Sequence, residues 1–280
     1  YKAGVSAQLK SAVILAGLNS HGITNIIENE RSRDHTENML LKNKSVFKIK
    51  NNKQKLITVY GKKFLQPSKI EVPGDPSSAA FFTALTLLNK NSSILIKNVG
   101  LNPTRIGFYK ILKKHRAKIR FKNLKKVNNE IQGDIIVKSS NLKPIKAEKK
   151  YYVNSTDEYP ILFIIAALTK GKSIFKGIGD LVNKESNRIK EMQKVLKQIG
   201  IKSKSTKSDL IIHGRKEINI KSKKINIRNL GDHRICMSAF VLAVITGAMT
   251  KINNFETVFT SSPSFLKIMK DLGAKFEIQK

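Results

Sequence analysis

Four segments of the sequence repeat the same order of structural signals, and this repetition restricts the possible folds more than any other feature. The segments begin at Val5, Gly74, Ser155 and Gly231, at intervals of roughly 70 to 80 residues. Each opens with a residue type that caps helices, runs through an apolar helix and breaks at Gly or Asn. The chain therefore folds as several copies of one unit.

The rest of each copy predicts what that unit contains. A short β-branched strand follows each break, at residues 23–27, 93–99, 173–178 and 250–255. A polar loop and a second helix come next, and the apolar side chains of this helix recur at helical spacing. In the last copy these apolar side chains are Phe265, Ile268, Met269 and Leu272. In the second copy they are Phe108, Ile111 and Leu112. The unit reads βαβαββ.

The two helices of a unit have different environments in this prediction. The first is apolar on all sides and should be buried, whereas the second has one apolar face and should lie at a surface. Several units stacked around their first helices give an α/β fold of repeated βαβαββ units, with buried parallel helices and outer sheets. The N-termini of parallel helices gather on one face and offer free N–H groups to an anion.

The polar residues at these helix starts differ from copy to copy, which a purely structural repeat does not require. Acids and cations from separate copies can meet at one mouth. The residues in question are Ser6, Gln8, Lys10, Arg31, Arg33, Asp34, His35, Asp157, Glu158, Lys184, Glu185, Arg188, Asp232, His233 and Arg234.

Composition narrows the class of protein. The net charge of +33 arises from Lys spread along all 280 residues, which favours compositional bias over a dedicated basic arm, and such a field attracts anionic substrates. Cys236 is the only cysteine, so no disulfide framework exists and a reducing cytoplasm fits. No apolar run reaches the roughly 18 residues of a membrane span, and no metal-ligand spacing of histidines is present.

Seven motifs, in order along nearly the whole chain, resemble the enolpyruvyl transferase family. The likeness is to its bacterial members that act on shikimate 3-phosphate. The motifs are SAQLKSAVILAGL, SRDHTE, VPGDPSSAAFF, DEYPIL, NKESNRIKEM, GDHRICMS and SSPSFLKIMKDLGA.

The resemblance implies an architecture of two globules, each with three βαβαββ units, that close over a cleft. Residues 1–73 then form the C-terminal part of the first globule, and residues 74–280 form the second globule with its three repeats. The crossover lies near Glu71–Gly74, and about two earlier units are expected to be absent. The resemblance implies no metal, no cofactor and a monomer when the protein is full length.

The resemblance also implies a reaction. The enolpyruvyl group of phosphoenolpyruvate is transferred to the 5-hydroxyl of shikimate 3-phosphate, and phosphate leaves. Shikimate 3-phosphate is then held by Ser6, Ala7, Gln8, Arg33, Asp157 and Lys184.

The catalytic and phosphoenolpyruvate-binding roles follow in the same way. Asp157 accepts a hydrogen bond from the sugar-ring hydroxyl, and Lys184 lies beside it. Glu185 is the proton donor and acceptor for the methylene carbon. Gln8, Arg188 and Arg234 hold phosphoenolpyruvate, since guanidinium forks suit carboxylate and phosphate.

Two other functions stay open at this point. An enolpyruvyl transferase acting on UDP-N-acetylglucosamine has the same architecture, although it would lack SRDHTE. A non-catalytic polyanion-binding protein is argued from the charge and the Lys-rich loops, but aromatic residues are only 7% and tryptophan is absent. The sequence therefore favours small anionic substrates over nucleic acid or a membrane.

Overall fold

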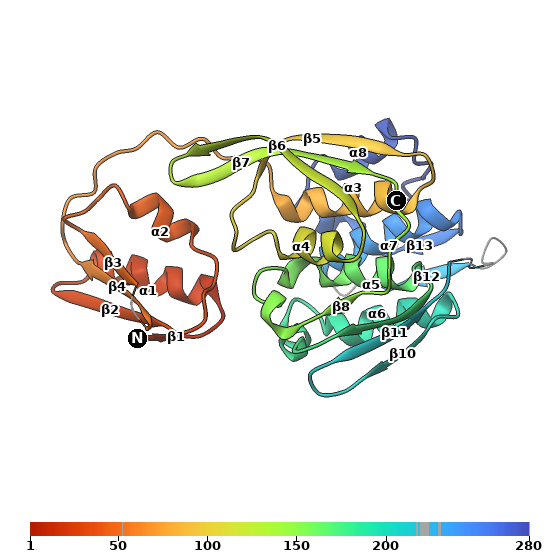
Figure 1. The fold of residues 1–280 in the computed structure, drawn as a ribbon, viewed down its shortest axis with the longest axis horizontal. Helices are drawn as coiled ribbons and strands as arrows, with labels where there is room; N and C mark the ends of the chain where they lie inside the picture. The colour runs from red at the N-terminus through yellow and green to blue at the C-terminus, as the bar shows by residue number, and fades with distance from the viewer. Residues whose placement is uncertain (52, 217, 219–223, 229–230, 280) are drawn as a thin grey trace.

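The chain forms two lobes of unequal size in the computed structural model, which describes residues 1–51, 53–216, 218, 224–228 and 231–279. The smaller lobe holds residues 1–60 and the larger one begins at residue 74. Residues 61–73 cross between them without helix or strand, as Figure 1 shows at the upper left.

The smaller lobe is one complete βαβαββ unit. Its sheet has the order β1-β2-β4-β3, and α1 and α2 connect its strands. The elements are β1 (Lys2–Ala3), α1 (Ala7–Asn19), β2 (Ile23–Glu28), α2 (His35–Leu40), β3 (Phe47–Asn51) and β4 (Lys55–Tyr60).

The larger lobe contains the other three copies. The second copy comprises α3 (Pro76–Leu88), β5 (Ser93–Gly100), α4 (Gly107–Lys114), β6 (Lys118–Val127) and β7 (Glu130–Lys138). The third comprises β8 (Lys146–Ala147), η1 (Lys149–Tyr151), η2 (Thr156–Glu158), α5 (Tyr159–Ala167), β9 (Gly171–Phe175), η3 (Gly179–Asn183), α6 (Arg188–Gln198), β10 (Lys202–Ser205) and β11 (Leu210–Gly214). The fourth comprises β12 (Ile225–Ile227), α7 (His233–Thr246), β13 (Thr250–Ile252), η4 (Phe255–Val258) and α8 (Phe265–Asp271).

Strand pairing confirms the repeat but not the full βαβαββ pattern in the last copy, whose sheet has only β12 and β13, with no strand after α8 among the described residues. The third copy has the sheet order β8-β9-β11-β10, which repeats the order of the smaller lobe. In every copy the first strand pairs in parallel with the second, as Lys2 with Ile27, Lys146 with Ile174 and Ile225 with Thr250. In the second copy that first strand is reduced to one parallel bridge, between Gly74 and Val99.

The first helices of the larger lobe form its core, as predicted. Helices α3, α5 and α7 pack against one another and against the sheets around them. All nine residues of α5 are buried, because this helix is apolar on every side. The sequence prediction of an α/β fold with buried helices and outer sheets is confirmed for this lobe.

Helix α1 contradicts the same prediction. It packs on β2 and β4 with only Lys10, Ile14 and Gly17 buried, while Leu9 is 60% and Leu15 51% exposed. The physical reason is the number of neighbours: α3, α5 and α7 have each other, whereas α1 shares its lobe with a single sheet and α2. In α8, likewise, Phe265 and Met269 are buried but Ile268 and Leu272 are exposed.

The two lobes have separate hydrophobic cores. The core of the smaller lobe centres on Ile14, Ile26 and Ile57, and the larger lobe has a continuous core from Ala79 to Ala274. The lobes are therefore joined largely by polar side chains. In the described ranges, each helix is too short or too polar to cross a lipid bilayer.

Candidate active site

The starts of four helices of the larger lobe meet in one polar cluster. Arg188 begins α6 and donates from Nε to Asp232 Oδ2 at 2.9 Å, at the start of α7. Its Nη1 lies 3.5 Å from Asp157 Oδ1, just before α5. Ser77 of α3 donates to the neighbouring Glu158. The predicted gathering of helix N-termini is thus present.

The acids at these helix starts differ in whether they cap their own helix. The carboxylate of Asp75 accepts from Ser78 N at 2.9 Å and that of Asp232 from Arg234 N at 3.0 Å, so both cap their own helices. At α5 the capping position is held by Glu158, whose side chain makes no capping bond. Asp157 and Glu158 consequently direct their carboxyl groups at other elements.

Arg188 is the centre of the cluster. It is fully buried, and its Nη2 donates to Glu185 Oε2 at 2.6 Å in addition to the bond with Asp232. Glu185 itself is 47% exposed at the side chain. The arrangement holds one oxygen of Glu185 on a buried cation and leaves the side chain half-exposed.

Arg33 brings the smaller lobe to this cluster. Its Nη2 lies 2.6 Å from Asp157 Oδ2, and both side chains are about three-quarters buried. Arg33 stands in the loop between β2 and α2, within the SRDHTE motif. Two residues that the sequence assigned to one substrate therefore lie in direct contact across the two lobes.

The electrostatics of Asp157 follow from these neighbours. Burial by itself would raise the pKa of Asp157, but Arg33, Arg234 and Arg188 outweigh burial and hold the pKa well below its usual value. Asp157 is accordingly an ionised hydrogen-bond acceptor at neutral pH. In return, Asp157 raises the pKa of Arg33 despite the opposing effect of burial.

Glu158 has the opposite environment although it is the next residue. It is fully buried, and burial together with the charge of Asp157 raises its pKa, in spite of Ser77, Arg105 and Arg234. The pKa values of the two adjacent carboxyl groups are thus shifted in opposite directions. Such a pair is typical of sites in which one group acts as an acid and the other as a base.

Arg234 is buried at the start of α7 with hydrogen-bond capacity to spare. Its Nε and Nη1, and Nη1 of Arg188, are buried and have no hydrogen-bond acceptor among the described residues. An unsatisfied buried donor costs about 1–3 kcal/mol. Guanidinium nitrogens of this kind, two on Arg234 and one on Arg188, are suited to a carboxylate or a phosphate.

Lys184 lies in this region but contacts a different acid from the one expected. Its Nζ is 2.8 Å from Asp180 Oδ2, one turn earlier in η3, whereas the sequence analysis placed it beside Asp157. Asp180 also accepts from Tyr152 Oη at 2.9 Å. Burial would raise the pKa of Asp180, but the bonds from Lys184 and Tyr152 lower it overall.

The predicted residues at the start of α1 remain apart from the cluster. Ser6 caps α1, with Leu9 N 3.4 Å from its Oγ, Ala7 is half-buried and Gln8 is exposed. No hydrogen bond among the described residues joins these three to the cluster around Arg188. Lys10, which the sequence placed at the mouth, is instead fully buried against Glu28 and Glu37, at 2.8 and 2.6 Å.

Arg105 and Ser77 are absent from the predicted site residues. Arg105 Nη2 donates to Asp75 Oδ1 at 2.6 Å and to Ser77 Oγ at 2.8 Å, so it ties the loop after β5 to α3 and, through Ser77, to Glu158. Its partners precede it by 30 and 28 residues. The polar "PTR" after a strand is the one local signal, and it does not identify those partners.

Comparisons with known proteins show which family the chain is similar to. The sequence pattern of the family described as EPSP synthase (3-phosphoshikimate 1-carboxyvinyltransferase) matches residues 2–269. A 3-phosphoshikimate 1-carboxyvinyltransferase of Zymomonas mobilis is 40% identical over 276 residues, which are 98% of this chain and 61% of that protein. One from Petrotoga mobilis is 40% identical over 97% of this chain and 62% of its own length.

Solved structures show the same relationship. The EPSP synthase of Acinetobacter baumannii superposes with a TM-score of 0.84 and 34% identity, over 100% of this chain and 63% of that one. The enolpyruvyl transferase NikO of Streptomyces tendae, at 15% identity and a TM-score of 0.66, shares the fold. The chain spans about three-fifths of the length of the relatives that it matches. With a matching pattern over nearly all of its residues, the chain belongs to the EPSP synthase (3-phosphoshikimate 1-carboxyvinyltransferase) family.

Proposed function

We propose that the protein containing this chain transfers the enolpyruvyl group of phosphoenolpyruvate to the 5-hydroxyl of shikimate 3-phosphate. The products are 5-enolpyruvylshikimate 3-phosphate and phosphate, in the biosynthesis of chorismate and aromatic amino acids. The observation that carries the proposal is the cluster in which the buried Arg188 contacts both Asp157 and Glu185, while Nε and Nη1 of the buried Arg234 have no hydrogen-bond acceptor among the described residues. Its charges match a reaction between two anionic substrates.

Asp157 is the acceptor for the attacking hydroxyl in this proposal. Its low pKa keeps it ionised, and an ionised carboxylate accepts a hydrogen bond and orients the hydroxyl for attack on the enol carbon. Lys184, held by Asp180 in the absence of substrate, supplies a cation beside the substrate. For Lys184 to reach the hydroxyl, its bond to Asp180 must be exchanged.

Glu185 is the proton donor and acceptor at the methylene carbon. When the hydroxyl oxygen adds to the enol carbon, the hydroxyl proton passes to Asp157 and the methylene carbon gains a proton from Glu185, which gives a tetrahedral intermediate. The methyl carbon then returns a proton to Glu185 as phosphate leaves, and the phosphate takes the proton that Asp157 received. A single exposed carboxyl can serve both steps because the second is the chemical reverse of the first at that carbon. The bond from Arg188 at 2.6 Å orients Glu185 for both.

Arg188 and Arg234 hold phosphoenolpyruvate, together with Gln8. A planar guanidinium can donate two parallel bonds to a carboxylate or phosphate, and both arginines are already desolvated. Arg33 pairs with the phosphate of shikimate 3-phosphate. Ser6, Ala7 and Gln8 also hold this substrate. Binding therefore exchanges the Arg33–Asp157 bridge for one bond from each residue to the substrate.

The proposal extends to the setting of the reaction. The substrates are small anions, the full-length protein is a monomer, and the reaction takes place in the cytoplasm. The expected architecture of two globules, with residues 1–73 in the first and 74–280 in the second, supplies the cleft in which both substrates lie. Glyphosate, which competes with phosphoenolpyruvate in this family, is the expected inhibitor.

The test is phosphate release by the full-length protein from phosphoenolpyruvate with shikimate 3-phosphate. Asp157→Asn and Glu185→Gln are assayed beside Glu191→Gln, a matched change on α6 where Glu191 pairs only with Lys194 at 2.8 Å among the described residues. We expect a loss on the order of a hundredfold or more in the first two and none in the third.

Other results would redirect the proposal. Release in the wild-type protein that survives both substitutions would remove the assigned roles but keep the reaction. Absence of release from folded protein would contradict the reaction, and UDP-N-acetylglucosamine and RNA are then the next substrates and ligands to assay.

A further inference from the structure

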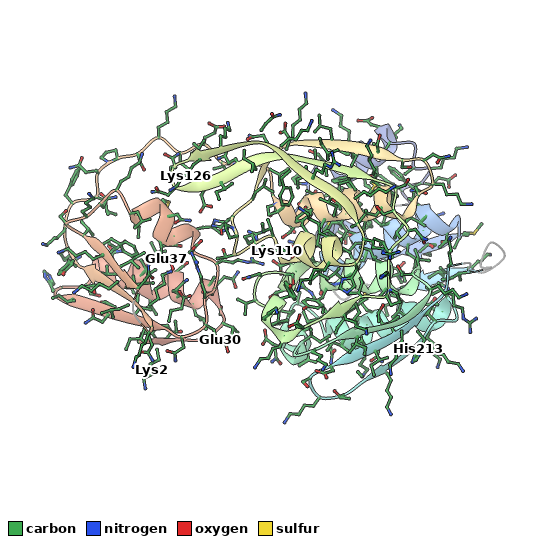
Figure 2. The ribbon with its side chains drawn as sticks, in the orientation of Figure 1. Lys2, Glu30, Glu37, Lys110, Lys126 and His213 are labelled. Atoms are coloured by element: carbon green, nitrogen blue, oxygen red, sulfur yellow. The ribbon has the colours of Figure 1, made fainter. Side chains whose placement is uncertain are left out.

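The lobes contact each other through one short segment. Among the described residues, every hydrogen bond between residues 1–60 and residues 74–279 has its partner in the smaller lobe within residues 33–42, as donor or as acceptor. Apart from Arg33, which contacts Asp157, these residues contact the loop after β5 and the turn between β6 and β7. That hairpin reaches over the smaller lobe near Lys126 (Figure 2). We name the contact of Asp34, His35 and Asn38 with Asn102 and Glu130 the latch.

Asn102 is the bridge of the latch. Its Nδ2 donates to Asp34 Oδ1 of the smaller lobe and to Glu130 Oε2 of the larger lobe, both at 2.8 Å. The orientation of the amide is fixed because its Oδ1 accepts from Thr104 N at 2.8 Å and from Thr104 Oγ1 at 2.7 Å. Asn102 and Asp34 are buried. Losing the amide donor leaves Asp34 Oδ1 with only the longer bonds from Asn38 at 3.3 Å and Thr104 at 3.4 Å, and removes the donor that Glu130 Oε2 has at 2.8 Å.

Glu130 collects further donors from the smaller lobe. Its Oε1 lies 2.8 Å from Nδ1 of His35 and accepts from Nδ2 of Asn38 at 3.0 Å. Burial opposes ionisation of Glu130, but the bonds from His35, Asn38 and Asn102 lower its pKa overall. One carboxylate thus receives two side chains of α2 and the bridging amide.

Helix α2 is fixed equally firmly to its own lobe. Glu37 is buried inside the smaller lobe (Figure 2), 2.6 Å from Lys10 and 2.9 Å from Lys55. Glu28 accepts from Ser32 N at 2.9 Å and from its Oγ at 2.6 Å, which holds the loop next to Arg33. A displacement of α2 therefore moves the loop that carries Arg33.

The linker adds a few hydrogen bonds on this side: Asn128 Nδ2 donates to Lys69 O at 3.0 Å, and Gln66 N donates to Asn43 Oδ1 at 2.8 Å. The linker is exposed, with Val72 at 81%. A cavity of about 350 Å³ lies between the linker, α2 and the latch, lined by residues that include Met39, Ile70 and Glu130. Since the space beside the latch is open and the two cores are separate, the latch and the Arg33–Asp157 bridge set the approach of the lobes.

We propose that Asp34, Asn102 and Glu130 are positioning residues for Arg33: their bonds hold the start of α2 on the larger lobe and so place the guanidinium at the substrate phosphate. This inference rests on the proposed function for the identity of that phosphate. The latch residues are not among the substrate contacts of the proposed function. Loss of the latch should therefore affect binding of the phosphate more than the chemical step.

The test uses full-length protein with Asn102→Asp, which removes both amide donors and places a charge between two carboxylates. Asn123→Asp is the matched control, because Asn123 donates to Asp134 at 2.7 Å within the β6–β7 hairpin and contacts only the larger lobe among the described residues. Glu130→Gln is a second, milder variant should the first fail to fold. Amide hydrogen exchange over residues 31–41 is measured with the KM for each substrate.

We expect faster exchange over residues 31–41 and a KM for shikimate 3-phosphate raised on the order of tenfold, with kcat changed less than about twofold. Asn123→Asp should leave all three unchanged. Unchanged exchange in folded Asn102→Asp and Glu130→Gln would overturn the latch, and faster exchange with an unchanged KM would overturn its role for Arg33. Wild-type protein without turnover would contradict the proposed function, and exchange would still decide whether the latch holds α2.

Discussion

Arg33 and Asp157 are separated by 124 positions in the sequence, yet the Arg33 guanidinium lies 2.6 Å from the Asp157 carboxylate and joins the two lobes. Each satisfies the charge of the other in a partly buried site. A substrate that presents a phosphate to Arg33 and a hydroxyl to Asp157 replaces one ion pair with two contacts. The bridge thus keeps the cluster neutralised until substrate enters.

Replacing Arg33 with Ala should raise the KM for shikimate 3-phosphate on the order of a hundredfold, because a charge-assisted contact with the phosphate is lost. The KM for phosphoenolpyruvate should change far less. Steady-state kinetics with each substrate varied in turn measures both values. Arg120→Ala, an exposed change on β6, is the control. Equal effects on both KM values would contradict a dedicated role for Arg33.

Replacing Arg234 with Lys should weaken phosphoenolpyruvate binding on the order of tenfold or more, since an ammonium cannot provide the planar fork. The unpartnered Nε and Nη1 of Arg234 identify the donors that would be lost. Titration with phosphoenolpyruvate, followed by protection against thermal unfolding, measures the affinity without turnover. Arg215→Lys at an exposed position is the control, and an affinity equal to wild type in Arg234→Lys would rule out this contact.

Local features of the site could be predicted from the sequence. Asp75 and Asp232 were recognisable as helix starts because a cap acts on backbone N–H groups two or three residues away. The burial of α5 followed from its uniformly apolar composition. These predictions depend on neighbours in sequence alone, which is why they are correct.

Long-range partners could not be predicted. Lys184 has acids on either side, and only the fold shows that its ammonium lies on Asp180. Lys10 follows a helix start, but the folded lobe buries it against Glu28 and Glu37. The exposure of Leu9 and Leu15 depends on how many units surround α1, which the pattern of α1 itself does not specify.

Ser77→Ala should destabilise the larger lobe by about 1–3 kcal/mol, because Glu158 loses its hydrogen-bond donor in a fully buried position. Glu158→Gln should cost less, since burial already disfavours the charged form of Glu158. Urea unfolding of both variants gives the comparison. Ser78→Ala, on the same turn of α3 but bonded to Asp75, is the control. A larger loss in Glu158→Gln than in Ser77→Ala would contradict this account.

The stability of the smaller lobe should depend on pH through Glu28. Burial would raise the pKa of Glu28, but bonds from Lys10 and Ser32 lower it to about 2, from 4.5 for an unperturbed glutamate. The folded lobe therefore binds fewer protons than the unfolded chain, so the stabilisation is complete above pH 4.5 and is lost as the pH falls from 4.5 to 2.

Glu28→Gln tests this directly. At neutral pH it should cost about 3 kcal/mol, because Lys10 stays buried with one acid fewer, and it should remove most of the pH dependence between 4.5 and 2. Glu30→Gln changes the same charge at an exposed position two residues on. Urea unfolding at a series of pH values measures both. A Glu28→Gln protein as acid-sensitive as wild type would show that the loss of stability arises from other carboxylates.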